Sequence, residues 1–425
     1  MEVILGLIGI CLAVLFMVLL GLKFPYLKKI ILIGGILRIL AGCFHYFILK
    51  LPDGIIDAVK FENNAWRFAE MPFIDFLNSF KSQNLALSFV WVLSFIYRFV
   101  GRSPLLLQSV SISIGIYCII LVFKLAFLVS KNRAKSKQAA AIFAFFPTVI
   151  LYNVLILREV YIMMFLLLAF IYLVKWQSSY LLSNGLLALL FFSILYFLHG
   201  ALLIAAALFF VLLVKFSSSF FLFRLKQQKL LFPNLALILI TPVLMVVLLF
   251  YISNINLPYL GKLTHVFTFS RILFQSEVTN LGGSSYPDWL IPNSLPDFFL
   301  LIIPRVLYLL FSPFFWDLRA INHLLGFVDG IMYIFIFYWL LRGVFQKKRK
   351  QIISTFYIIL IPLLITYSWG VGNFGTALRH RVKFIPVFIA LSSIYFPKIV
   401  LHNKSRSRIS NNSESNNFYF EGGCS

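Results

Sequence analysis

Charge is scarce in this 425-residue chain, and acidic charge is the scarcest. Charged residues make up 12% of the sequence and hydrophobic residues 61%, with 14 Asp or Glu against 37 Lys or Arg. Many apolar runs reach the length of about 18 residues that can cross a bilayer. A soluble core of this size cannot absorb so much apolar surface, so the composition excludes a soluble globular protein and predicts an all-α, polytopic membrane protein.

Cysteine is also rare, and the basic residues are dispersed. Three of the four cysteines, Cys11, Cys43 and Cys118, lie in apolar segments and Cys424 lies near the C-terminus, so neither a disulfide framework nor a metal-ligand spacing is present. The net charge of +23 comes from Lys and Arg residues that punctuate apolar segments. No basic face with interleaved aromatics is formed, which excludes nucleic acid as a partner.

The basic residues instead orient the chain in a membrane. The positive-inside rule places Lys23, Lys28 and Lys29 in the cytoplasm, and the same rule applies to the cluster at 131–137. The sequence therefore predicts about eleven spans, with the N-terminus outside and the C-terminus inside. They are 2–21, 30–49, 104–129, 138–155, 159–174, 180–197, 201–214, 230–252, 323–341, 352–369 and 384–400.

Two further apolar stretches do not fit this alternation as spans. Residues 71–100 and 300–315 are predicted to form interfacial or half-membrane helices within the large outer loops, 50–103 and 253–322. The predicted organisation is an extra N-terminal span at 1–29, one membrane module at 30–215 and a second, variable module at 216–404. The Ser/Asn-rich tail, 405–425, is predicted to be disordered.

The acidic residues are distributed asymmetrically in this topology. Asp329 lies in a span and two glutamates lie in the tail, which leaves eleven of the fourteen acids on the outer side and none in the cytoplasmic connections. The eleven are Glu2, Asp53, Asp57, Glu62, Glu70, Asp75, Glu159, Glu277, Asp288, Asp297 and Asp317. Because acids contribute little to orientation, the asymmetry indicates an outer face that performs polar chemistry.

The first outer loop begins with an acid-rich stretch, LPDGIIDAVKFENNAWRFAE. Asp57 is predicted to be the general base for an acceptor hydroxyl, with Asp53 as the second candidate. Either carboxylate is also a possible ligand for a divalent cation, Mg²⁺ or Mn²⁺. The alternative is that both acids only cap or solvate the loop.

Two short outer turns contain the other candidate residues. At the first, Glu159 is predicted to be a second carboxylate of the site, and Arg158 is predicted to bind an anionic group. The alternative is that these two charged residues only mark the membrane interface. The second has the sequence GNFGTALRHRVKF, which places three cations and a histidine in a turn predicted to be outside. We interpret them as ligands of a (pyro)phosphate, with anionic lipid headgroups as the alternative: Arg379, His380, Arg381 and Lys383.

Charges within the spans form a separate class. Arg38 lies near the middle of the second span and Asp329 lies inside the ninth, and such charges are costly unless paired. We predict that these two residues form a buried structural pair. His199, at another outer turn, either joins the site or contacts lipid headgroups.

The arrangement of these segments resembles the conserved half of the GT-C superfamily. The resemblance covers residues 30–200, through the acidic outer loop, the segment YRFVGRSPLLLQSVS, a basic inner turn and the segment FPTVILYNVLILRE. GT-C proteins are polytopic glycosyltransferases that use polyprenyl-phosphate-linked sugars. The resemblance implies that Asp57 is the catalytic aspartate and Glu159 the second-loop acid. The close acidic pair here is Asp53 and Asp57, four residues apart, which departs from the family pattern.

The second half resembles other surface-polysaccharide proteins. RVLYLLFSPFFWDL and GNFGTALRHR are similar to segments of Wzy-type O-antigen polymerases. Together the resemblances imply an inverting glycosyltransferase of the bacterial cytoplasmic (inner) membrane. Its partners would be a polyprenyl-linked sugar donor, a glycan or lipid-linked acceptor, membrane lipids and other polysaccharide-assembly proteins. A repeat-unit polymerase is one alternative, and a transporter or flippase of a lipid-linked or anionic solute is another.

Overall fold

The computed structural model describes residues 1–82, 88–226, 256–257, 261–262, 283–320, 323–344 and 350–397. These residues are helical apart from turns, loops and two short antiparallel strands, β1 (Asn256–Leu257) and β2 (Gly261–Lys262). The predicted span at 230–252 and the predicted tail at 405–425 lie outside the described residues. The α-helices are α1 (Glu2–Lys23), α2 (Lys28–Phe47), α3 (Asp57–Glu70), α4 (Phe73–Ser82), α5 (Ser88–Val100), α6 (Pro104–Ser130), α7 (Arg133–Ala144), α8 (Pro147–Val154), α9 (Glu159–Ser179), α10 (Leu182–Leu198), α11 (Leu203–Lys226), α15 (Leu295–Phe311), α16 (His323–Val344), α17 (Lys350–Trp369), α18 (Phe374–Arg381) and α19 (Ile385–Ser392).

Six helical segments are long and apolar enough to cross a membrane. They are 2–23, 25–47, 104–130, 159–179, 323–342 and 351–369, and each overlaps a predicted span. α7 and α8 form a bent pair with a 60° break, which would make a seventh span. The predicted spans at 180–197 and 201–214 contain only shorter apolar helices, and the one at 384–400 contains the eight-residue α19. The helices are consistent with an integral membrane protein, and they do not confirm the count of eleven.

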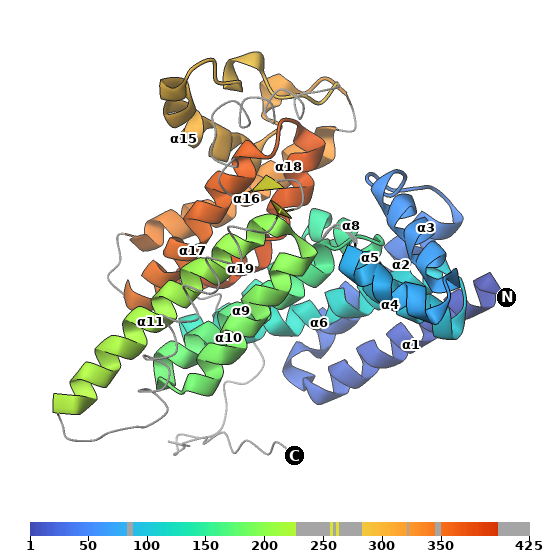
Figure 1. Cartoon of the computed structure of the whole chain (residues 1–425), viewed down its shortest axis with the longest axis horizontal. Helices are drawn as coiled ribbons and strands as arrows, with labels where there is room; N and C mark the ends of the chain where they lie inside the picture. Colours follow the sequence, from blue (N-terminus) through green and yellow to red (C-terminus); the bar gives the residue numbers. More distant parts are fainter. Residues whose placement is uncertain are drawn as a thin grey trace, which may run out of the picture.

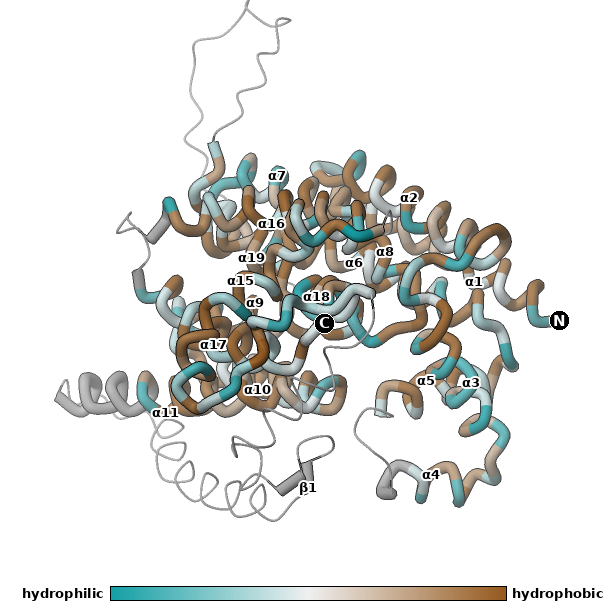
Figure 2. The backbone as a smooth tube through the Cα atoms, turned by 90° about the horizontal axis from the view of Figure 1, so that it is seen from above, coloured by the Kyte–Doolittle hydropathy of each residue, from teal (hydrophilic) through white to brown (hydrophobic). Residues whose placement is uncertain are grey.

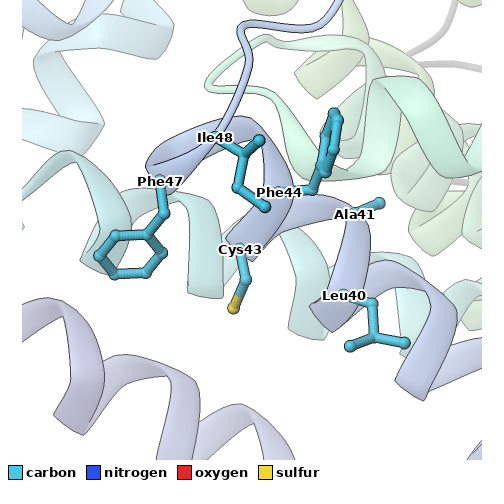
Figure 3. A pocket seen from close by; sticks show the side chains of 6 residues that line it. All are labelled: Leu40, Ala41, Cys43, Phe44, Phe47 and Ile48. Atoms are coloured by element: carbon cyan, nitrogen blue, oxygen red, sulfur yellow. The ribbon is translucent and has the colours of Figure 1, made fainter.

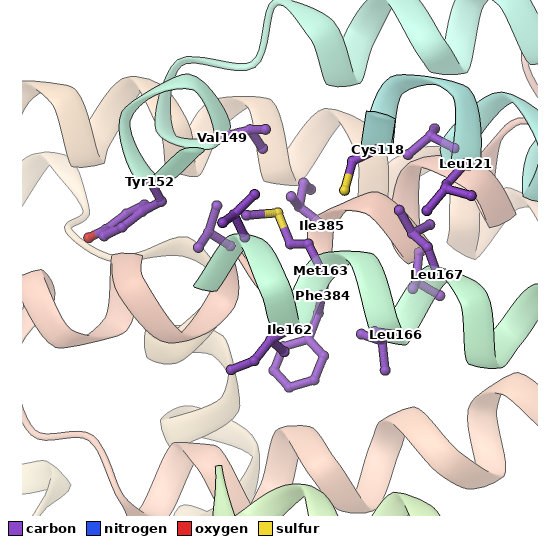
Figure 4. Packing of buried hydrophobic residues seen from close by; sticks show 14 of the residues in the cluster. Cys118, Leu121, Val149, Tyr152, Ile162, Met163, Leu166, Leu167, Phe384 and Ile385 are labelled. Atoms are coloured by element: carbon purple, nitrogen blue, oxygen red, sulfur yellow. The ribbon is translucent and has the colours of Figure 1, made fainter. Parts of the chain in front are cut away.

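α6 lies at the centre of the bundle. It packs against α1, α2, α7, α8, α9 and α19, and its apolar residues are buried around most of its circumference (Figure 1). A helix that is hydrophobic on all sides is expected to be enclosed by others. Figure 4 shows part of this core, in which Cys118 of α6 lies among side chains of α8, α9 and α19. Helices at the periphery expose apolar side chains instead, such as Leu12 of α1 and Leu40 of α2.

The connections that contain acidic residues gather at one end of the bundle. Gly6 of α1 lies against Leu105 of α6, where an added Cβ would come within 2.6 Å of the Leu105 Cβ. The amino ends of α1 and α6 therefore lie side by side. The same end holds 48–57, 158–159, 198–200 and 370–383, which contact one another as described below. We call this end the acidic end.

The opposite end brings together basic segments. The Arg133 guanidinium lies 4.4 Å from the centre of the Tyr26 ring, and Lys135 donates a hydrogen bond to the Ile394 carbonyl. Residues 24–29, 131–137 and 394–397 thus meet at what we call the basic end. Asp53, Asp57 and Glu159 thus lie at the end of the bundle opposite to these basic segments.

The helices in the predicted interfacial stretches are short. α5 has 13 residues and packs on α3, which is amphipathic and buries Phe61 and Ala65 against it. Figure 2 shows that α3 contains more hydrophilic residues than α6 or α16. α15 has 17 residues and exposes Phe299, Leu300 and Ile303.

A buried arginine connects α15 to its surroundings. Arg305 donates hydrogen bonds to the carbonyls of Leu290, Ser368 and Val371, at 2.7 to 3.1 Å. The Ser368 and Val371 carbonyls lie at and just after the carboxyl end of α17, and Leu290 is the last residue of a short 3-10 helix, Asp288–Leu290; helical partners are missing at such ends. Arg305 therefore fixes α15 beside the turn that precedes α18, and the sequence analysis did not single it out.

Candidate functional site

An arginine on α18 joins two carboxylates from distant parts of the chain. Arg379 Nε donates to Glu159 Oε1 at 2.8 Å, and Arg379 Nη1 donates to Asp57 Oδ2. Arg379 is separated from Glu159 by 220 residues and from Asp57 by 322. The fold therefore brings together one residue from each of three turns that the sequence analysis singled out.

The local structure explains how these side chains are positioned. Asp57 is the first residue of α3 and Glu159 the first residue of α9, where free backbone N–H groups and the helix dipole favour negative charge. Asn373 caps the amino end of α18, and its side chain accepts a hydrogen bond from the Thr376 amide. This cap sets the start of α18 and, one and a half turns later, the position of Arg379.

The two carboxylates differ in access to solvent. The Asp57 side chain is 45% exposed, whereas that of Glu159 is fully buried and that of Arg379 is 13% exposed. Burial disfavours the charged guanidinium of Arg379, but the Glu159 and Asp57 carboxylates outweigh it and raise the Arg379 pKa above its ordinary value. Arg379 is therefore a permanent cation, and Asp57 is the carboxylate that a substrate can reach.

Asp53 has a different partner. Its carboxylate accepts a hydrogen bond of 2.5 Å from the Tyr152 hydroxyl, and its φ of 61° lies in the left-handed region that aspartate tolerates. Burial raises the Asp53 pKa, while the Tyr152 hydrogen bond and Arg379 oppose this shift. In Figure 4 the Tyr152 hydroxyl lies at the edge of the apolar core. Tyr152 was not predicted as a site residue, although it lies within the segment FPTVILYNVLILRE.

A cluster of basic side chains lies behind Arg379. We call Arg158, His199, His380 and Lys383 the basic cluster; Lys383 is fully buried and the other three residues are half-buried. Lys383 Nζ is 2.7 Å from His380 Nδ1 and 3.7 Å from Glu159 Oε1, and the His199 and His380 rings lie 5.4 Å apart. Arg158 Nη1 donates to the Leu198 carbonyl at 3.0 Å. The predicted anion ligands Arg158, Arg379, His380 and Lys383 are thus brought together, and His199 joins them.

Burial determines the charge of this cluster. It lowers the pKa of His380 well below its ordinary value, and the nearby Lys383, His199, Arg379 and Arg158 contribute in the same direction. The pKa of His199 is lowered well below its ordinary value for the same reasons. Burial also lowers the pKa of Lys383, against the opposing effect of Glu159. The histidines are therefore neutral, and an anion bound beside Lys383 would favour its charged form.

Several polar atoms in this region have no protein partner among the described residues. They are Arg158 Nε, Glu159 Oε2, His199 Nδ1, Tyr367 Oη and Arg379 Nη2, all buried. Buried polar atoms are normally hydrogen-bonded. Their concentration around Arg379 is what a site for a polar ligand requires.

Arg381 does not belong to this cluster, which corrects its predicted role in phosphate binding. Residues two apart on a helix point in different directions, and Arg381 faces away from Arg379. Its Nε donates to Asp329 Oδ2 at 2.8 Å, and its Nη atoms donate to carbonyls of α15, α16 and Ser312. Arg381 is fully buried and holds these elements together.

The predicted pair between Arg38 and Asp329 is not formed. Arg38 Nη1 donates to the carbonyls of Gly34 and Ala144, at 2.8 and 2.9 Å. Ala144 is the last residue of α7, so its carbonyl lacks a helical partner where the α7–α8 pair breaks. Asp329 instead pairs with Arg381 and accepts a hydrogen bond from Thr148.

The site geometry does not match that of a metal centre. Within the described ranges, no three His, Cys, Asp or Glu side chains lie close enough together to hold a metal ion. Arg379 occupies the position between Asp57 and Glu159 that a divalent cation would take. These residues therefore do not fit a bound Mg²⁺ or Mn²⁺ ion.

Apolar grooves lie on the bundle away from these polar groups. One, of about 500 Å³, follows the carboxyl half of α2 and is lined by Leu40, Ala41, Cys43, Phe44, Phe47 and Ile48 (Figure 3). Its upper end, at Ile48, is nine residues from Asp57 in the sequence. Another, of about 360 Å³, lies between α1 and α6.

Comparison with protein-family models, with curated protein sequences and with solved structures finds no match for this chain.

Proposed function

We propose that the protein is a membrane glycosyltransferase of GT-C type. It would transfer a sugar or a repeat unit from a polyprenyl-(pyro)phosphate carrier to a glycan or lipid-linked acceptor during assembly of cell-surface polysaccharide. The observation that supports this most is the convergence of Asp57, Glu159 and Arg379 at the acidic end. It places an accessible carboxylate beside a permanent cation and the basic cluster, which are the groups that such a transfer needs.

The proposed setting is the bacterial cytoplasmic membrane. The acidic end would face out of the cell and the basic end the cytoplasm, in accordance with the positive-inside rule. About eleven spans, with the N-terminus outside and the C-terminus inside, complete this topology. α4, α5 and α15 would lie at the outer interface, where their exposed aromatic and aliphatic side chains contact lipid.

The reaction would be a single displacement at the anomeric carbon. Asp57 accepts the proton of the acceptor hydroxyl while the acceptor oxygen forms a bond to that carbon. The bond between the carbon and the carrier phosphate breaks, and its electron pair remains on the phosphate. Arg379 and Lys383 stabilise the phosphate as it leaves, and Glu159 positions both cations. One displacement inverts the configuration at the anomeric carbon.

The position of the site supports an enzyme over a transporter. Transporters bind their substrates near the bilayer midplane between repeats. Here the polar groups lie at one end of the bundle, at the amino end of α9 and beside the carboxyl end of α2. An isoprenoid tail would lie along the apolar groove on α2, whose last lining residue, Ile48, precedes Asp57 by nine residues in the sequence (Figure 3).

Deletion of the gene tests this function in the cell. Surface glycans and lipid-linked intermediates would be extracted from the deletion strain and from the same strain carrying the wild-type gene. Loss of long chains with a single repeat unit retained on lipid identifies a polymerase, and a uniformly truncated glycan identifies a transferase of one sugar. Unchanged glycans and unchanged intermediates would refute the proposal.

A further inference from the structure

We propose that the carrier phosphate and the Asp57 carboxylate compete for Arg379, so that donor binding releases Asp57 to act as the base. This inference rests on the proposed glycosyl transfer and adds an order of events to it. The donor would bind first, and only then would Asp57 be free to accept the proton of the acceptor hydroxyl. The ligand class is a phosphate monoester or diester on an isoprenoid chain.

Asp57 is not free in the structure. Arg379 Nη1 donates to Asp57 Oδ2, so one oxygen of the proposed base is already occupied. An acceptor hydroxyl needs a carboxylate oxygen within hydrogen-bond reach to lose its proton. The structure thus has one oxygen of the base held by Arg379, and an anion that replaces Asp57 on Arg379 would leave both of its oxygens available to the acceptor.

Asp57, and not Glu159, is the partner that can leave. The Asp57 side chain is 45% exposed, so water can replace the contacts that it gives up. Glu159 is fully buried between Arg379 and Lys383, and separating it would leave a buried charge without a partner. Glu159 therefore holds the Arg379 guanidinium in place. On the solvent side of the guanidinium, the carrier phosphate replaces the Asp57 carboxylate.

The groups that would receive the phosphate are already present. Arg379 Nη2 and Arg158 Nε are buried and have no hydrogen-bond partner in the described part of the chain. Arg379 Nε and Lys383 Nζ lie 2.8 and 3.7 Å from the same oxygen of Glu159, so these two basic groups face one point. A phosphate has more acceptor oxygens than a carboxylate and accepts paired donors from arginine. It can bind these free donors as well as the one that Asp57 uses.

If Asp57 and the carrier phosphate compete for Arg379, removing the Asp57 carboxylate should strengthen phosphate binding. The full-length protein would be placed in phosphatidylcholine nanodiscs and titrated with farnesyl phosphate by isothermal calorimetry. We expect Asp57→Asn to bind farnesyl phosphate about threefold more tightly than wild type, the scale of a part-exposed ion pair. Glu70→Gln removes an exposed acid from the same predicted face and should leave the affinity unchanged. Arg379→Gln should lose most of the binding.

Each other outcome overturns the inference in a distinguishable way. If wild type binds farnesyl phosphate and Asp57→Asn binds it equally or more weakly, the competition for Arg379 is refuted and the proposed glycosyl transfer is not. If no form of the protein binds farnesyl phosphate, both the competition and the proposed transfer are refuted. Farnesol and inorganic phosphate are titrated in parallel, and phosphatidylglycerol is added in a further arm. If phosphatidylglycerol binding, and not farnesyl phosphate binding, is strengthened by Asp57→Asn, the site recognises a lipid headgroup and the inference fails. Asp57→Ser serves as a second variant should Asp57→Asn not fold.

Discussion

Asp329 and Arg381 form an ion pair in which both side chains are fully buried, with 2.6 Å between Asp329 Oδ2 and Arg381 Nη2. Arg381 also donates to the carbonyls of Leu310, Ser312 and Gly326. It thereby connects α15, α16 and the last residue of α18. Since Arg379 lies on the same short helix, this pair fixes the element that presents Arg379 to the two carboxylates.

The first prediction concerns this pair. Arg381→Met or Asp329→Leu should each destabilise the protein by about 3 kcal/mol or more, because each leaves a buried charge without a partner. The double variant should lose less than the sum of the two. Thermal unfolding of the detergent-solubilised protein measures all three. Additive losses in the double variant would show that the two side chains do not interact.

Arg38 provides the second prediction. Its guanidinium donates hydrogen bonds to carbonyls of α2 and α7 and lies over the Phe143 ring, and it forms no ion pair with Asp329. Arg38→Met should be destabilising because it leaves the Ala144 carbonyl unpaired at the helix break. Combined with Asp329→Leu, its effect should be additive within about 0.5 kcal/mol. A coupling between these two positions as large as that of Asp329 with Arg381 would contradict the observed contacts.

The third prediction is an acid sensitivity caused by the half-buried histidines of the basic cluster. The pKa of His380 in the fold lies well below its ordinary value of 6.5, so the unfolded chain takes up a proton at a higher pH than the folded chain. The stability that depends on neutral His380 is complete above pH 6.5 and is lost as the pH falls below it. Melting temperatures of the wild type should therefore decrease from pH 7.5 to pH 5.

His380→Asn tests the origin of that slope. It removes one titrating group beside Lys383, Arg379, Arg158 and His199, so its melting temperature should depend less on pH. His323 lies on α16 outside the cluster, and His323→Asn is the matched control that should retain the wild-type slope. Identical slopes for the wild type and His380→Asn would show that the acid sensitivity arises elsewhere.

The fourth prediction separates the two candidate bases. Asp53 is held by the Tyr152 hydroxyl, whereas Asp57 is exposed and contacts Arg379. Asp53→Asn and Tyr152→Phe should reduce transfer by about tenfold at most, the scale of one hydrogen bond. Asp57→Asn should reduce it by about 10² to 10⁴, the scale of a general base. Rates in membranes from strains expressing each variant give the comparison, and a larger loss for Asp53→Asn would make Asp53 the base.

Some residues of the site could be predicted from the sequence because charged side chains next to membrane spans are costly and are therefore expected to have a function. Asp57, Glu159 and Arg379 stood out as charges that insertion does not require, and the structure brings them into contact. The role of Arg381 could not be foreseen, because it depends on which way each residue of the eight-residue α18 points. Arg38 was misassigned because its partner is a backbone carbonyl, created by a helix break that has no signal in side-chain charge.

The spans show a similar division. Long apolar helices such as α6 and α9 were predicted because length and hydropathy suffice to define them. The break between α7 and α8, and the short α19, interrupt runs that are mostly apolar, so hydropathy alone gave continuous spans there. Tyr152 and Arg305 were missed because their importance lies in contacts across the fold.

The most direct test of the proposed function follows the carrier lipid itself. In the deletion strain complemented with the wild-type gene, the lipid-linked sugar intermediate should be consumed and surface glycan restored. Complementation with Asp57→Asn, expressed at the wild-type level, should leave the intermediate accumulated and the glycan missing. Full restoration of the glycan by Asp57→Asn would contradict the role of Asp57 as the catalytic base.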